Sequence, residues 1–244
     1  MDDPRAQLRE HILEAKAWLA ARQDDAYERS IDAASRDMDR LLAALAPVHK
    51  GELPDTYDMD VIRSTFEEAL FDAFIGYASG GAVTKWRNAA GRAVLEAHSD
   101  AFYRGYEEAG AEETEPEDDA WLTKRQREQR EFLTGVFAWI KEQRDAETVT
   151  EDAIRARVEA WAQALDATYG EGKLRGNKSQ VLIWHLGETE DHCATCARLD
   201  GQRHKAKWYL DRDYIPGKAG AAMNCGGYRC GCFLTTKSGE TVTL

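Results

Sequence analysis

Apolar side chains recur at steps of three and four residues along most of the first 170 positions, which is the spacing of one face of an α-helix. The pattern predicts a first helix that begins at Asp3-Pro4 and a second over 27–45, which Pro47 ends. In the second helix the steps alternate as in a heptad repeat, the pattern of a helix that packs along another helix. Its apolar stripe consists of Tyr27, Ile31, Ala34, Met38, Leu41 and Leu45.

The next two predicted helices cover 58–77 and 83–109, after a connector over 47–55. The inward residues of the first are expected to be Ile62, Phe66, Ala69 or Leu70, and Ala73 or Phe74. The second carries mainly small residues at helical spacing, which would let another helix approach closely. That face is formed by Trp86, Ala90, Ala93, Ala97, Ala101 and Gly105.

An acidic stretch over 110–119 is expected to be an exposed, mobile linker, and two more helices follow it. The helix over 119–146 contains a polar stretch at 125–131 that is expected to face solvent. Its apolar face is expected to be Phe132, Val136, Phe137 and Ile140. The last helix is predicted to begin at Thr150 and to stop at Gly170, with Ile154, Val158, Trp161 and Leu165 inward.

Beyond Gly170 the helical periodicity disappears, and short buried strands are predicted at 181–184 and 232–236. The expected fold is therefore mainly α, with an N-terminal body of long amphipathic helices and a small, loop-rich α+β domain at the C-terminal end. The predicted organisation is a helical body over 1–112, an acidic linker over 113–119, a helical pair over 120–170 and a cysteine-rich domain over 171–244.

The net charge of −12 is unevenly distributed over the 244 residues. Residues 171–244 hold 11 Lys and Arg against 8 Asp and Glu, a balance of +3, so residues 1–170 carry a net charge of −15. No apolar run approaches the roughly 18 residues needed to cross a bilayer. The acidic N-terminus also lacks the apolar segment of a secretory signal, so we expect a protein made in a cytoplasm and not bound to a membrane.

All five cysteines lie between Cys193 and Cys232, and such clustering without a secretion signal points to metal binding. Cys193 and Cys196 form a C-x2-C pair, and Cys225 and Cys230 form a C-x4-C pair. Two thiolate pairs separated by a loop suit a tetrahedral structural zinc ion. Zinc binding would also help a domain with little regular structure to fold.

The expected metal ligands are Cys193, Cys196, Cys225 and Cys230. Cys232 and His192 are possible substitutes for the fourth ligand, because Cys232 follows Cys230 by two residues and His192 precedes the first pair. His185 is a further option. Free reduced thiols and disulfides remain the alternatives to metal.

No sequence motif of a catalytic site accompanies the cysteines. The chain lacks H-E-x-x-H, G-x-S-x-G, the deaminase pattern and a phosphate-binding glycine loop. The acidic residues 188, 190 and 191 near His192 are best interpreted as a surface loop. We therefore expect no enzyme, no catalytic residue and no small-molecule substrate.

The C-terminal motifs resemble those of phage minor head proteins, the head-morphogenesis group of the Mu F type. The resemblance rests on Trp184-His185-Leu186-Gly187, on His192 to Gly201 with its C-x2-C and L-x-G elements, and on the closing Cys225 to Leu234 segment. It covers about 60 residues of motif, and the helical remainder is generic. The closing motif here reads Arg-Cys-Gly-Cys, and Cys225 stands where many relatives have histidine.

The resemblance implies a low-copy virion protein that acts near the portal in head assembly, DNA packaging or DNA delivery. Its implied partners are portal or capsid proteins, with DNA as a further candidate, and its implied location is the virion after synthesis in the host cytoplasm. The partner-binding residues are unknown, although the heptad stripe and the small-residue face are candidates.

The alternative function is a nucleic-acid-binding zinc module. The C-terminal region carries clustered cations and five aromatic residues that would stack on bases, namely Trp184, Trp208, Tyr209, Tyr214 and Tyr228.

Overall fold

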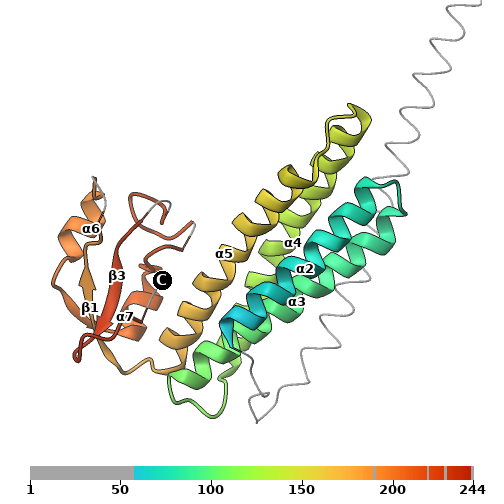
Figure 1. Ribbon diagram of the computed structural model, residues 1–244. Helices are drawn as coiled ribbons and strands as arrows, with labels where there is room; N and C mark the ends of the chain where they lie inside the picture. Colours follow the sequence, from blue (N-terminus) through green and yellow to red (C-terminus); the bar gives the residue numbers. More distant parts are fainter. Residues whose placement is uncertain (1–57, 189–190, 219, 228–229, 243–244) are drawn as a thin grey trace, which may run out of the picture. The chain divides into compact units, whose positions relative to one another are not determined.

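The computed structural model describes residues 58–188, 191–218, 220–227 and 230–242. It is mainly helical, as predicted, with four long helices followed by a small α+β domain (Figure 1). The long helices are α2 (Met59–Ala78), α3 (Val83–Glu108), α4 (Pro116–Asp145) and α5 (Glu151–Gly176). The two helices predicted within the first 45 residues, and the heptad stripe with them, lie outside the described residues.

Side chains at the helix starts explain where α2, α4 and α5 begin. Asp58 caps α2 by accepting a hydrogen bond from the Asp60 backbone N–H at 2.9 Å. Thr150 caps α5 in the same way through the Ala153 N–H at 3.2 Å, as the sequence predicts. Pro116 stands in the first turn of α4 beside three acidic residues, which favour the positive end of the helix dipole. The predicted end of the linker at residue 119 is therefore wrong, since residues 116–119 belong to the first turn of α4.

The core of the helical body consists of the predicted inward faces of α2, α3 and α5. Phe66 and Phe74 of α2 pack against Trp161 of α5, with ring centroids 6.3 and 6.4 Å apart. On α4 one prediction is wrong: Phe132 is 64% exposed, and the neighbouring Leu133 is buried instead. Leu133, Phe137 and Ile140 follow one another at steps of four and three, so Phe132 lies on the adjoining face.

Helices α3 and α5 cross with their backbones in direct contact. A Cβ atom on Gly172 would collide with the Phe102 carbonyl oxygen, and one on Gly105 would collide with the Tyr169 carbonyl oxygen. The small-residue face of α3 is therefore occupied by α5, and it is not a free surface for a partner. The predicted stop at Gly170 is also wrong, because the glycines of α5 serve close packing and the helix continues to Gly176.

Polar residues of α4 that were expected to face solvent are buried against α3 and α5. The Gln126 amide donates to the Leu95 carbonyl oxygen at 3.0 Å and to the Ser99 hydroxyl at 2.8 Å. The Gln129 side-chain oxygen accepts from the Trp161 indole N–H at 2.6 Å. Each buried amide thus has a partner on another helix, which offsets the cost of removing it from water.

His98 lies in the same polar layer and is fully buried. Its Nδ1 is 2.8 Å from the Thr168 hydroxyl, which itself donates to the Ala164 carbonyl oxygen at 3.2 Å. Because that hydroxyl proton is already used, the imidazole donates from Nδ1 and is neutral. Burial, aided by the positive charge of Arg125, lowers the pKa of His98 from 6.5 to about 3.

A buried ionic network joins α3, α4 and α5 near the start of the C-terminal domain. The Asp118 carboxylate is fully buried and accepts from the Tyr106 hydroxyl at 2.9 Å and from Arg175 at 3.0 Å, with Lys178 also 3.0 Å away. Its partners come from α3, from the last turn of α5 and from the segment that follows it. The acidic N-terminus of α4 is therefore bound to cations and is not a free linker end.

The C-terminal domain is built on a three-stranded antiparallel sheet with the order β2-β1-β3 (Figure 1). Its strands are β1 (Val181–His185), β2 (Arg203–Lys205) and β3 (Phe233–Thr236), and its helices are α6 (Ala194–Leu199) and α7 (Ala206–Asp211). Both predicted strands are present. The domain core includes Trp184, Tyr209, Leu234 and, from the end of α5, Leu174.

None of the helices in the described ranges has an apolar stretch of the length that a bilayer requires.

Alanine at Gly172 should destabilise the helical body, because the added methyl would force α5 away from the Phe102 carbonyl oxygen. We expect a loss of about 1–3 kcal/mol in the free energy of unfolding, measured by chemical denaturation. The matched control is Gly135→Ala on α4, where no atom lies within 4 Å of the new Cβ. That variant should gain about 0.5–1 kcal/mol from helix propensity. Equal effects of the two substitutions would contradict the close crossing.

The free energy of unfolding should decrease as the pH falls below 6.5, because the unfolded chain protonates His98 and the folded protein keeps it neutral until about pH 3. The contribution of this residue is about 1.4 kcal/mol per pH unit in that window. His98→Gln, which keeps a donor for Thr168 but does not titrate, should lack this part of the pH dependence. Identical pH profiles of the two proteins would show that the imidazole is not held neutral.

Candidate metal centre

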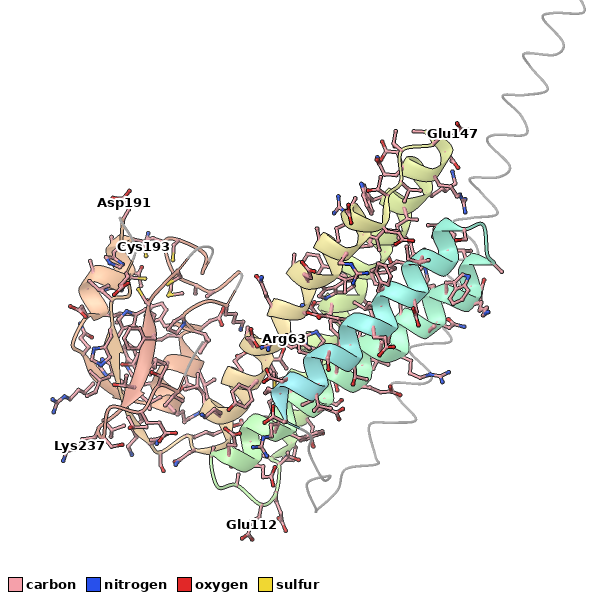
Figure 2. The ribbon with its side chains drawn as sticks, in the orientation of Figure 1. Arg63, Glu112, Glu147, Asp191, Cys193 and Lys237 are labelled. Atoms are coloured by element: carbon pink, nitrogen blue, oxygen red, sulfur yellow. The ribbon has the colours of Figure 1, made fainter. Side chains whose placement is uncertain are left out.

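The first cysteine pair is fixed by the start of α6. Cys193 is the N-cap residue of this helix, and its sulfur accepts a hydrogen bond from the Cys196 backbone N–H at 3.4 Å. Capping by the thiol turns the Cys193 side chain back over the first helical turn, where the Cys196 side chain also lies. The two sulfurs are 3.3 Å apart. Figure 2 shows sulfur atoms gathered beside Cys193 in the C-terminal domain.

Cys225 reaches the same place from a tight turn. Gly226 and Gly227 have positive φ angles of 61° and 76°, as expected for a turn that presents a cysteine to a metal. The turn is tied to α6, because the Thr195 hydroxyl donates to the side-chain oxygen of Asn224 and accepts from the Asn224 backbone N–H at 3.3 Å. This pairing fixes the position of Cys225 relative to the first cysteine pair.

Cys230 and Cys232 come from the segment that leads into β3, on either side of Gly231. The Cys230 sulfur lies 3.8 Å from that of Cys196. Gly187, which follows β1, has no room for a Cβ because the Gly231 carbonyl oxygen occupies that space. The backbone that carries these two cysteines is thus pressed against the end of the central strand.

All five cysteines have free thiols, and they form two groups of three that share Cys196. Cys193, Cys196 and Cys225 form one group, and Cys196, Cys230 and Cys232 form the other. Within each group every sulfur lies within 4.8 Å of the others. Sulfurs bound about 2.3 Å from one tetrahedral ion lie about 3.8 Å apart, so each group has dimensions that a metal ion could bridge.

The cluster contains the four expected ligands, but they do not fall into a single group. Cys230 belongs to one group with Cys232, while Cys193 and Cys225 belong to the other. The choice of the fourth ligand therefore stays a prediction. His192 is close to the cluster, with Nδ1 3.8 Å from the Cys232 sulfur. His185 is engaged elsewhere: its Nε2 is 2.9 Å from the Thr235 hydroxyl.

The thiols differ in how readily they ionise before any cation is bound. Burial raises the pKa of Cys196, and the adjacent Cys193 thiol adds to this effect. Burial also raises the pKa of Cys225. At Cys193 burial is outweighed by hydrogen bonds from Cys196 and Cys225, which lower its pKa to about 7. Of these three thiols, Cys193 is thus the first to become a thiolate, and a bound cation would favour ionisation of the other two.

Two acidic residues near the cluster in the sequence, Glu188 and Asp191, are exposed, and neither belongs to either group of donors. A thiolate-rich set of donors is typical of a metal site that holds a fold together.

Two of the aromatic residues predicted to stack on nucleic-acid bases are buried. Trp184 and Tyr209 have no exposed surface and pack against each other. Trp208 is half-buried; its ring centroid lies 3.6 Å from that of His204, which is stacked on it, and 4.3 Å from the Arg212 guanidinium. Trp184 and Tyr209 therefore belong to the domain core and offer no open face to a base.

In comparisons with protein-family models, curated proteins and solved structures, no match to this chain was found.

The cluster should hold at least one thiophilic metal ion per chain, measured by elemental analysis of protein purified without a tag. Cys193→Ser and Cys225→Ser should lose this metal together with the fold of the C-terminal domain, because each removes a ligand and metal binding stabilises the folded state. The control is Ala194→Ser, an exposed position on α6 between the first two cysteines. Native protein without metal would contradict the assignment of the cluster as a metal centre.

Proposed function

We propose that this chain is a minor head-morphogenesis protein of a tailed phage, of the type that the C-terminal motifs resemble. It is a component of the virion, made in the host cytoplasm, and it acts near the portal in head assembly, DNA packaging or DNA delivery. Its partners are portal or capsid proteins, and it catalyses no reaction.

One observation carries the proposal: the cysteines of the two separated motifs converge at one place. The sulfur of Cys196 lies 3.3 Å from that of Cys193, the N-cap residue of the same helix. It lies 3.8 Å from that of Cys230, in the segment that precedes β3. Cys193–Cys196 and Cys225–Cys232 are the elements on which the resemblance rests. Their meeting supports the interpretation of both as parts of one module.

The metal in this proposal is zinc in a structural role. Thiolates are soft ligands that suit a d10 ion such as Zn²⁺, and the predicted set of Cys193, Cys196, Cys225 and Cys230 would close the coordination shell. The segments that carry these residues are mainly loops, and zinc would fix them against β1 and α6. The ion would thereby stabilise a surface for protein partners without taking part in chemistry.

Nucleic-acid binding by the C-terminal domain is the second candidate function. Arg203 and Lys205 are exposed at alternate positions of the edge strand β2, which favours contact with phosphates. Because Trp184 and Tyr209 are buried, such binding would depend on charge and weaken steeply with added salt.

The proposal predicts that the protein copurifies with phage particles. Gradient-purified particles, assembled from the chain with the portal and capsid proteins of the same phage, should contain it in few copies, as measured by quantitative mass spectrometry. Cys193→Ser should reduce incorporation at least tenfold, whereas Ala194→Ser should not. Absence from particles, together with no binding to the purified portal or capsid protein, would contradict the proposal even if the metal is present.

A further inference from the structure

The metal centre offers more donors than one tetrahedral ion uses. Five thiols and the His192 imidazole lie together, whereas a closed zinc site takes four ligands. A single ion would therefore leave two donors without a metal. At least one of these two would be a thiol, for example the buried Cys232.

The donors are also divided in a way that one ion does not explain. Ligands of one tetrahedral ion would all be mutual neighbours. Here Cys193 and Cys225 approach one another and Cys196, while Cys230 and Cys232 form a separate group with the same Cys196. Cys196 is the most buried of the five, and it alone belongs to both groups.

A further candidate donor lies beside one thiol of the second group. The Cys232 sulfur lies 3.8 Å from His192 Nδ1. A sulfur and an imidazole nitrogen bound to the same zinc ion are about 3.6 Å apart, given bond lengths of about 2.3 and 2.05 Å. His192 lies beside Cys232 but is not a mutual neighbour of all three thiols of the second group. A shift of its imidazole toward Cys196 and Cys230 would complete a Cys₃His set, while the first group supplies three thiolates.

Net charge favours two ions with all these donors over one ion with four thiolates. One divalent ion with four thiolates leaves a net charge of about −2, since each thiolate carries one negative charge. Two divalent ions with five thiolates and a neutral imidazole leave about −1. The smaller net charge costs less to hold beside the apolar core that includes Cys196 and Cys232.

We propose that the cluster binds two thiophilic divalent ions of the zinc class, bridged by the Cys196 thiolate. One ion is held by Cys193, Cys225 and Cys196, with solvent in its fourth position. The other is held by Cys196, Cys230, Cys232 and His192. The inference rests on the proposed zinc site and revises its ligand set: Cys230 moves to a second ion with Cys232 and His192, and Cys196 becomes the bridge.

The test uses the full chain, stripped of metal and reloaded with excess ¹¹³Cd²⁺, after which unbound ions are removed by gel filtration. Native mass spectrometry should find two ions per chain. ¹¹³Cd NMR should show two signals coupled to each other, because a shared sulfur transmits spin coupling between the ions. His192→Ala and Cys232→Ser should each reduce the count to one, and Cys196→Ser should abolish the coupling.

His185→Ala is the matched control, since this imidazole contacts Thr235 and belongs to neither donor group. It should keep two ions. One ion per chain in the native protein, two uncoupled signals, or an unchanged count in His192→Ala would overturn the two-ion centre while the single structural zinc stands. No bound ion at all would overturn the zinc site of the proposed function as well.

Discussion

The crossing of α3 and α5 is the constraint on which the rest of the described structure depends. Gly105 and Gly172 allow the two backbones to touch, so that α5 can continue beyond Gly170 without being pushed outward. The last turns of α5 then carry Leu174 into the core of the C-terminal domain. One helix thereby contributes to both hydrophobic cores.

Buried polar groups give this packing its specificity. Asp118 of α4 binds Arg175 and Lys178 next to the crossing. Glu171, one turn before Arg175 on α5, is 3.3 Å from Lys218 of the C-terminal domain. Burial raises the pKa of Glu171, although Lys218 and Arg175 act in the opposite direction. Such pairs add little net stability, because desolvation offsets much of the attraction. They do penalise any other alignment of α5, since a shifted helix would leave charges buried and unpaired.

The cysteine cluster serves the domain beyond α5 in a comparable way. Its sheet has short strands, and long loops bring Cys225, Cys230 and Cys232 back to α6. Ordering these loops costs conformational entropy that a core of this size offsets only in part. Polar contacts such as Thr195 with Asn224 already guide the loops toward one another. Metal binding at the cluster would supply the remaining stabilisation, which is why we place the ion in a structural role.

The sequence by itself determined the long helices of the described body, the central strand β1, the edge strand β3 and the clustering of the cysteines. These features follow from periodicity, caps and short spacings, which act between residues close together in the chain. Only the tertiary structure decided that Gln126 is buried and that Gly172 packs against another helix. It also decided that Cys196 belongs to two groups of donors. Each of these features depends on a contact with a residue far away in the sequence. Local patterns of apolar and polar residues do not show which distant residues come into contact.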